Sequence, residues 1–260
     1  MALGSRGTLF VALVSFVLAM FASSAASADY RVVLDPGHGG RDGGATGRGG
    51  TSEKEVVLNV ARYVRDALAD VQGIDIVLTR DSDISLRLED RVAVGRNAAA
   101  NLFVSIHADS IRSPRVRGAS IYTLANKASD EIAASLADGQ DRSDVLAGFD
   151  APADEPEVAD ILLDLMRRET KAFSRAAAKR FVGTLGKRTR LIRNPHRYAN
   201  FRVLKAPDVP SILVELGYLS NRSDEQQLSD PHWQRKMAQA LAEAVIAHAR
   251  ETGHLPPSDG

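Results

Sequence analysis

The chain has 260 residues, of which 44% are hydrophobic and 25% charged, enough for one domain with a substantial buried core. Lysine and arginine together number 33, as do aspartate and glutamate, so the formal net charge is zero. No overall charge attracts the chain to nucleic acid or to an anionic membrane, and we expect neither as a partner. Cysteine is absent, so any metal site has to be built from histidines and carboxylates.

Residues 1–28 have the three-part pattern of a secretory signal peptide. Arg6 supplies the basic region and residues 9–21 form the apolar run, after which Ala26-Ser27-Ala28 provides a small-residue cleavage site. The alternative is a retained membrane anchor, but the run is shorter than the ~20 residues needed to span a bilayer. We therefore expect cleavage after Ala28 and a soluble, exported, periplasmic protein without stable membrane insertion.

The next part of the chain alternates between strand and helix patterns. A β-rich run at 30–34 leads into a Gly-rich loop at 36–50. Ser52 and Glu55 then match a capping box at the start of a helix. A strand, a helix and another strand follow at residues 74–79, 86–100 and 102–106. This order predicts a single α/β domain over residues 29–252, with a mixed, mostly parallel sheet flanked by helices.

The second half of the chain contains fewer strand patterns. Strands are predicted at 118–124 and 209–214, and the segment between them shows no strand character. It is expected to be helical over about residues 125–186, with a helix at 126–137 and a broken, polar stretch at 139–156. The domain then closes with an amphipathic helix and a disordered tail, at residues 232–250 and 253–260.

Four polar side chains are predicted to meet at one edge of the sheet. Ligands of open α/β sheets bind beyond the carboxyl ends of the strands, and His38, His107 and Glu215 each follow directly on a predicted strand. Glu53 joins them, because the first helix has to start at the edge where the first strand ends. Two imidazoles and a carboxylate suit a Zn²⁺ site that keeps one position open for water, and a further carboxylate can act as general base. We therefore predict zinc bound by His38, Glu53 and His107. Glu215 is the predicted catalytic base.

Each of these residues also has a simpler interpretation. A histidine in a Gly-rich loop can be a turn residue, and a glutamate in a first helical turn needs only the helix dipole to explain it. A histidine and a glutamate at the ends of buried strands can form a structural pair. Other candidates are weaker, because the Gly-rich loop lacks a phosphate-binding motif and Ser105 lacks a nucleophile elbow. The remaining histidines are expected near the surface: His196, His232, His248 and His254.

Four ordered motifs carry a resemblance to a known family. They are Val-Leu-Asp-Pro-Gly-His-Gly-Gly at 33–40, Glu-Lys at 53–54, Ser-Ile-His-Ala-Asp at 105–109 and Val-Glu-Leu-Gly-Tyr-Leu-Ser-Asn at 214–221. With them the chain resembles the zinc-dependent N-acetylmuramoyl-L-alanine amidases, and more narrowly the cell-separation amidases AmiA, AmiB and AmiC. The resemblance implies the same zinc ligands and catalytic glutamate. It adds the substrate, which is the amide between N-acetylmuramic acid and the L-alanine of the peptidoglycan stem peptide.

The resemblance also implies a role for the helical segment after Leu124. In the cell-separation amidases such an insertion covers the active site until a partner with a LytM-type domain displaces it, and an acidic residue in the insertion can occupy the open zinc position. Relatives often carry Glu-Asn where this chain has Gln140-Asp141. Because a neutral amide is a poorer zinc ligand than a carboxylate, either Asp141 or Asp144 takes this role or the block is weaker. The alternative is a solvated acidic loop without regulatory consequence.

Two other functions remain open at this stage. One is a different exported zinc hydrolase, such as a peptidase or a deacetylase. The other is an inactive relative that binds peptidoglycan or activates another enzyme, although the four intact site residues argue against it. Release of free stem peptides from purified sacculi distinguishes the amidase from both.

Overall fold

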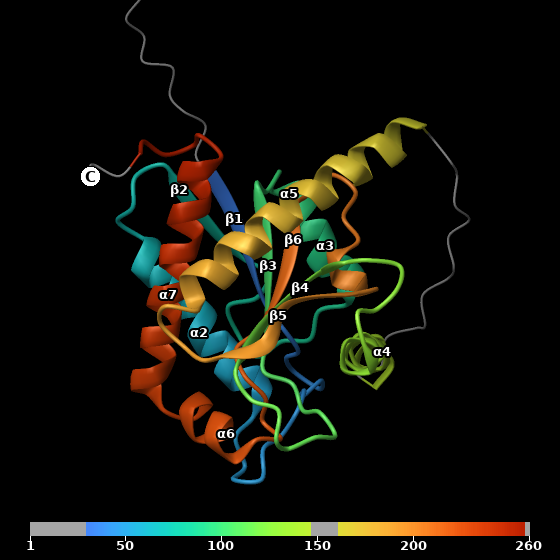
Figure 1. The fold of residues 1–260 in the computed structure, drawn as a ribbon, viewed down its shortest axis with the longest axis vertical. Coiled ribbons are helices and arrows are strands. Elements are labelled where there is room, and N and C mark those ends of the chain that lie inside the picture. Colours follow the sequence, from blue (N-terminus) through green and yellow to red (C-terminus); the bar gives the residue numbers. More distant parts are fainter. Residues whose placement is uncertain (1–29, 147–160, 258–260) are drawn as a thin grey trace, which may run out of the picture.

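The computed structural model describes residues 30–146 and 161–257, apart from the side chains of residues 142–146 and 161–164. Within this part a six-stranded sheet runs through the molecule in the order β2-β1-β3-β6-β4-β5 (Figure 1). The predicted signal peptide lies outside the described residues, and no helix within them combines the length and apolar character that a membrane span requires. The strands are β1 (Tyr30–Pro36), β2 (Ile74–Leu78), β3 (Leu102–His107), β4 (Ala119–Leu124), β5 (Leu191–Ala199) and β6 (Ser211–Glu215).

The pairing of the strands confirms the predicted mixed, mostly parallel sheet. The neighbours β2, β1, β3 and β6 are parallel to one another. Strand β4 is antiparallel to β6, and β5 is parallel to β4. Parallel strands end at a common edge, and β3 and β6 are in register there, with His107 opposite Glu215. Two predicted site residues are therefore neighbours by backbone pairing alone.

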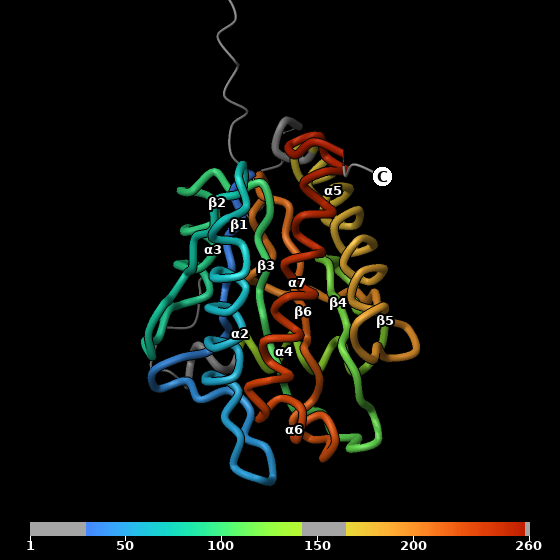
Figure 2. Tube along the Cα trace, turned by 90° about the vertical axis from the view of Figure 1, so that its left-hand side faces the viewer, coloured from blue at the N-terminus to red at the C-terminus, as the bar shows by residue number. Residues whose placement is uncertain are grey.

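Helices cover both faces of this sheet (Figures 1 and 2). One face packs against α2 (Glu53–Leu68), α5 (Ile161–Leu185) and α7 (Pro231–Glu251). The other face packs against α3 (Leu88–Asn97), α4 (Glu131–Leu146) and the 3-10 turn η1 (Arg202–Leu204), and the short helix α6 (Arg222–Leu228) leads into α7.

The strands supply both cores by alternation of their side chains. In β3, Val104 and Ile106 belong to the core under α2 and α7, whereas Phe103 points into the core on the opposite face. The same division holds in β6 for Val214 and Leu213. Burial on both faces explains why the central strands are continuous apolar runs, which made them readable in the sequence.

Helix α2 begins at Glu53, which places this carboxylate at the sheet edge. The N-cap residue Ser52 makes no side-chain cap hydrogen bond, so the predicted capping box with Glu55 is not formed. Backbone contacts hold the helix start instead, because Ser52 forms an isolated β-bridge with Thr46 and the Glu53 amide donates to the Ala45 carbonyl at 2.9 Å. The helix start is thereby anchored to the Gly-rich loop.

Strand β5 was missed by the sequence analysis, which assigned no strand character between Leu124 and residue 209. Residues 191–199 include Arg193 and Pro195 and lack an apolar alternation. The strand lies at the edge of the sheet beside β4, where a proline and half-exposed polar side chains are tolerated. A polar edge strand leaves little hydrophobic pattern to detect.

Helix α4 starts later and continues further than predicted. The sequence predicts a helix at 126–137 and a broken stretch from Gly139, but α4 runs unbroken over Glu131–Leu146. Leu136 and Ala137 are buried against the core that contains Phe103. This tertiary packing outweighs the cost of about 1 kcal/mol that a glycine carries inside a helix.

The C-terminal end is more ordered than predicted. His248 was expected near the surface but is only 2% exposed, and its ring lies edge-on to Tyr30 with centroids 6.2 Å apart. Leu255, within the predicted tail, is buried and lies against Gly73. The chain up to residue 257 therefore folds back over the start of β1, because both apolar surfaces gain by leaving water. His232 is exposed, as predicted.

Candidate metal centre

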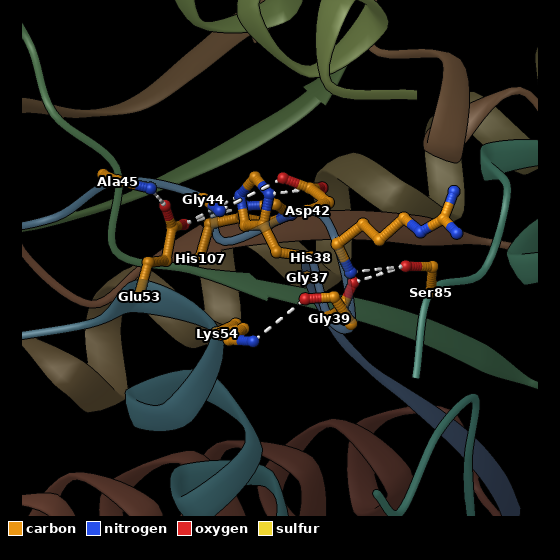
Figure 3. A network of polar contacts seen from close by, with 12 residues as sticks. Gly37, His38, Gly39, Asp42, Gly44, Ala45, Glu53, Lys54, Ser85 and His107 are labelled. Atoms are coloured by element: carbon orange, nitrogen blue, oxygen red, sulfur yellow. Dashed lines mark hydrogen bonds and ion pairs between the residues drawn. The ribbon is translucent and has the colours of Figure 1, made fainter. Parts of the chain in front are cut away.

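His38, Glu53 and His107 converge from three elements at the carboxyl edge of the sheet (Figure 3). His38 follows β1, Glu53 opens α2 and His107 ends β3. Their ligand atoms all lie within 4.8 Å of one another, and all three side chains are buried. Among the described residues this is the only group of histidine and acidic side chains that could hold a metal ion.

Glu53 lies between the two imidazoles. Its Oε1 is 3.2 Å from His38 Nε2 and 3.1 Å from His107 Nδ1. The same oxygen accepts a hydrogen bond from the Ala108 amide at 2.9 Å, and Oε2 accepts one from the Ala45 amide at 2.8 Å. Two backbone donors thus fix the carboxylate, which prearranges it as a ligand.

His38 is oriented by Asp42, a residue that the sequence analysis did not single out. His38 Nδ1 lies 2.7 Å from Asp42 Oδ2, whereas the buried Nε2 has no hydrogen-bond partner and faces Glu53. A carboxylate that accepts from one ring nitrogen sets the tautomer and leaves the other nitrogen free to bind a metal. No signal in the sequence indicates this pair, because a spacing of four residues brings side chains together in a helix and not in a loop.

The glycines of the loop make room for the side chains of His38 and His107. A Cβ atom at Gly37 would lie 2.5 Å from His107 Nε2, and one at Gly44 would lie 2.7 Å from His38 Cδ2. Gly44 also has a φ of +63°, which favours glycine. The Gly-rich loop therefore packs against imidazole rings and does not cradle a phosphate.

Two buried arginines hold the backbone around His38, which itself has a φ of +58°. Arg91 Nη2 donates to the His38 carbonyl at 2.8 Å, and Arg91 Nη1 donates to Asp35 Oδ1 at 2.8 Å. Arg80 Nη2 donates to the Gly37 carbonyl at 2.7 Å. Sequence reasoning missed both arginines, because nothing in their local pattern indicates burial.

Glu215 faces the centre from β6. It is fully buried, its Oε2 accepts from the Asp109 amide at 3.1 Å, and its Oε1 has no hydrogen-bond partner. Burial, followed by the charges of Asp109 and Glu53, raises the pKa of Glu215 well above its ordinary value. A carboxyl group with a raised pKa beside a metal site is suited to taking up a proton and giving it back.

The charges of the three converging residues favour a cation. Burial alone would lower the pKa of His38, but Glu53 and Asp42 raise it well above its usual range. For Glu53, burial would raise the pKa, but the two histidines hold it well below its usual value. Burial lowers the pKa of His107. A divalent cation would take over the role of the positive charge on His38 and release its proton.

The donor set fits zinc. Two imidazoles and one carboxylate with an open position are a known catalytic zinc arrangement. The unpartnered Nε2 of His38 and Oε1 of Glu215 are buried polar atoms that need a partner, which an ion and a water molecule would provide.

Gln140 of α4 lines a small cavity beside two of the candidate ligands, His38 and His107. The cavity that it lines with His38, His107 and Val203 measures about 20 Å³, which is room for about one water molecule. Gln140 is 4% exposed, and neither its Oε1 nor its Nε2 has a hydrogen-bond partner. Asp141 instead lies 4.0 Å from Arg202 Nε. The side chain of Asp144 lies outside the described residues.

Comparison with known proteins assigns the family. A family model described as N-acetylmuramoyl-L-alanine amidase matches residues 32–247. The chain belongs to the N-acetylmuramoyl-L-alanine amidase family. The prediction of this enzyme class from the four motifs is confirmed.

Individual relatives agree with this assignment. The chain is 39% identical to AmiA of Escherichia coli over 218 residues, which cover 84% of this chain and 75% of AmiA. It is 40% identical to AmiC of Neisseria meningitidis over 215 residues, 82% of this chain and 51% of that protein. The chain thus spans three quarters of one relative and about half of the other.

Solved structures show the same fold. AmiC2 of Nostoc punctiforme matches with a TM-score of 0.58 and 31% identity, covering 85% of this chain and 97% of that one. The catalytic domain of CwlV from Bacillus (Paenibacillus) polymyxa matches with a TM-score of 0.60 and 29% identity, covering 85% and 98%. These neighbours bear out the α/β domain that the sequence predicted.

Proposed function

We propose that the chain hydrolyses the amide between N-acetylmuramic acid and the L-alanine of the peptidoglycan stem peptide, with zinc bound by His38, Glu53 and His107. The observation that carries the mechanism is the buried Glu215, which is paired in register with His107 and has one oxygen without a hydrogen-bond partner. Membership of the amidase family supports the substrate.

Zinc, when bound, would activate a water molecule and polarise the carbonyl oxygen of the scissile amide. Glu215 accepts the proton of the attacking water at Oε1 and delivers it to the leaving nitrogen. The Asp109 amide keeps Oε2 in place during both transfers. Asp42 holds His38 in the tautomer whose Nε2 faces inward.

Removal of zinc tests the metal dependence. Treatment with a chelator is expected to abolish release of stem peptides from purified sacculi, because the remaining carboxylates cannot polarise the amide. Zinc, but not magnesium, should restore release, since the nitrogen ligands suit zinc. The melting temperature should also fall on chelation, because the ligands are buried together. Full activity in the metal-free protein would contradict the proposal.

The cellular setting also belongs to the proposal. The signal-peptide pattern of residues 1–28 supports export to the periplasm, and the similarity to AmiA and AmiC supports a role in cell separation or wall remodelling. Detection of the mature N-terminus after residue 28 in periplasmic extracts tests the export step.

We further propose that α4 is an autoinhibitory lid that a LytM-domain activator displaces. The cavity of about 20 Å³ beneath Gln140 is too small for an amide group and its flanking sugar. The buried Gln140 lines the cavity beside His38 and His107, whereas the carboxylate of Asp141 lies toward Arg202. A neutral amide binds a zinc ion more weakly than a carboxylate does. The free energy needed to move α4 away from the centre is therefore lower with Gln140 than with a glutamate.

Loosening the contact between α4 and the core is expected to raise activity in the absence of an activator. Leu136→Ala removes a buried side chain of α4 without altering the centre, and such a loss weakens packing by about 2–5 kcal/mol. Basal release of stem peptides should rise by about tenfold or more, because the open state becomes more populated. Asp138→Ala, on the exposed side of the same helix, is the control. An unchanged rate in folded Leu136→Ala protein would argue against the lid.

A further inference from the structure

A second, larger recess lies at the same edge of the molecule as the metal centre. It encloses about 680 Å³, compared with about 20 Å³ for the cavity lined by His38, His107 and Gln140. Its lining residues come from the Gly-rich loop, the loop before β4 and the segment 220–229, which contains α6. Figure 2 shows the backbone of these segments at the same end of the molecule. This volume lies within the range of small-molecule and peptide sites. We call it the arginine groove, after Arg48 and Arg222 in its lining.

The walls of the arginine groove are fixed by buried polar contacts. Glu225 of α6 is 7% exposed, and its Oε1 accepts from the Gly49 amide at 2.6 Å. A Cβ atom at Gly47 would clash with the same carboxylate, so the loop packs closely on the helix. Asn221 Nδ2 donates to the Pro114 carbonyl at 2.6 Å, which connects the loop before β4 to the segment that begins α6. A groove held in this way is present before any ligand binds, which lowers the entropy cost of binding.

The charge of the groove is positive. Arg48 and Arg222 are both exposed, and neither forms an ion pair within the described part of the chain. The acidic side chain in the lining, Glu225, accepts a hydrogen bond from the Gly49 amide. Two unengaged guanidinium groups in one groove favour a ligand with carboxylates, because each can donate two parallel hydrogen bonds to such a group.

The groove is within reach of the scissile bond. Gly44 packs against His38 and Glu53, and Arg48 follows it four positions later, which is at most about 14 Å of extended chain. Two to three residues of an extended peptide cover about 7–10 Å. A peptide that leaves the metal centre along this loop would therefore bring its second and third residues to the groove.

We propose that the arginine groove binds the peptide side of the substrate, with Arg48 and Arg222 recognising its carboxylates. This inference rests on the amidase activity and names a specificity site for it. In peptidoglycan the lactyl carboxyl is consumed in the amide and the N-acetylated sugars are uncharged, whereas the stem peptide carries free carboxylates after its L-alanine. A cationic groove therefore matches the peptide and not the glycan.

A binding experiment tests this assignment without requiring turnover. The probes are the free stem tripeptide L-alanyl-γ-D-glutamyl-diaminopimelate and the same peptide with its α-carboxyl groups amidated. The zinc-loaded full chain is expected to bind the acidic peptide about tenfold more tightly by titration calorimetry, and this preference should weaken at high salt. Arg48→Gln/Arg222→Gln is expected to bind both peptides equally weakly. Lys236→Gln, which removes one positive charge from the exposed side of α7, is the control and should behave as the unmodified protein.

Three results would overturn the proposal: no binding of the acidic peptide, no preference for it over the amidated one, or full binding by the double variant. Equal melting temperatures exclude misfolding as a cause, since both arginines are exposed. Digestion of sacculi by the same preparations separates the two claims. If stem peptides are released but not bound, the groove assignment is wrong and the amidase activity stands. If the acidic peptide is bound selectively but stem peptides are not released from sacculi, the groove assignment stands and the proposed amidase activity is wrong.

Discussion

Glu215→Gln is expected to abolish peptide release from sacculi while leaving zinc bound. Glutamine keeps the shape of the side chain and can still accept from the Asp109 amide, but it cannot take up a proton from water. Loss of a general base lowers rates by about 10²–10⁴-fold. Since Glu215 is not among the proposed ligands His38, Glu53 and His107, the metal content should stay at that of the unmodified enzyme.

The measurement combines quantification of released peptides with metal analysis of the same preparation. Glu243→Gln, an exposed glutamate on α7 that pairs with Arg188, is the matched control and is expected to retain activity. If Glu215→Gln released peptides at the normal rate with zinc fully bound, a different group would have to carry the proton. If it lost zinc, Glu215 would be a ligand and the division of roles would be wrong.

Arg91→Leu is expected to destabilise the fold and weaken zinc binding together. Breaking a buried ion pair by removing one partner costs about 3–5 kcal/mol, because the remaining Asp35 carboxylate is left buried without its counter-charge. The variant also loses the hydrogen bond from Arg91 to the His38 carbonyl, so the loop that carries His38 is held less firmly. Urea unfolding should show the lower stability, and chelator competition should show zinc affinity reduced by about 10–100-fold.

Two further variants keep this prediction informative. Arg91→Lys retains the charge but not both donors, so zinc affinity should fall more than stability. Arg96→Leu removes an exposed arginine from the same helix, whose pair with Asp208 is partly solvated, and should cost at most about 1 kcal/mol. Unchanged unfolding and zinc affinity in Arg91→Leu would show that the buried pair does not support the centre.

The Asp35–Arg91 pair also predicts a pH dependence. Burial alone would raise the pKa of Asp35, but Arg91 and hydrogen bonds from Thr79 and Ser105 hold it below its ordinary value. A group whose pKa is depressed on folding stabilises the protein above its unfolded pKa, about 3.9, and loses this contribution as the pH falls through the folded value. The stability difference between the unmodified protein and Asp35→Asn should therefore shrink on acidification below about pH 4.

The sequence predicted the central fold well because the parallel strands are buried on both faces. Runs such as the one ending at His107 are apolar throughout, and their order with the helices indicates the α/β class. The polar edge strand β5 and the unbroken course of α4 were not predicted. Strand β5 is stabilised by pairing with β4, and α4 is stabilised by packing of Leu136 into the core that contains Phe103. Both contacts join distant parts of the chain.

By itself the sequence determined the donor chemistry of the site. It contains no cysteine, and its histidines and glutamates follow strands that must share an edge, so His38, Glu53, His107 and Glu215 could be named in advance. These residues can be recognised in the sequence because the parallel strands of one sheet end at the same edge.

The tertiary structure alone decided what surrounds those four residues. Asp42 orients His38, Arg91 supports the loop that carries His38, and Arg48 and Arg222 line one groove. None of these roles follows from residue type or spacing, because surface and buried arginines look alike in a sequence. The physical reason is that each role depends on contacts between segments that are far apart in the sequence. These contacts form only when the helices pack on the two faces of the sheet and bury the polar groups between them.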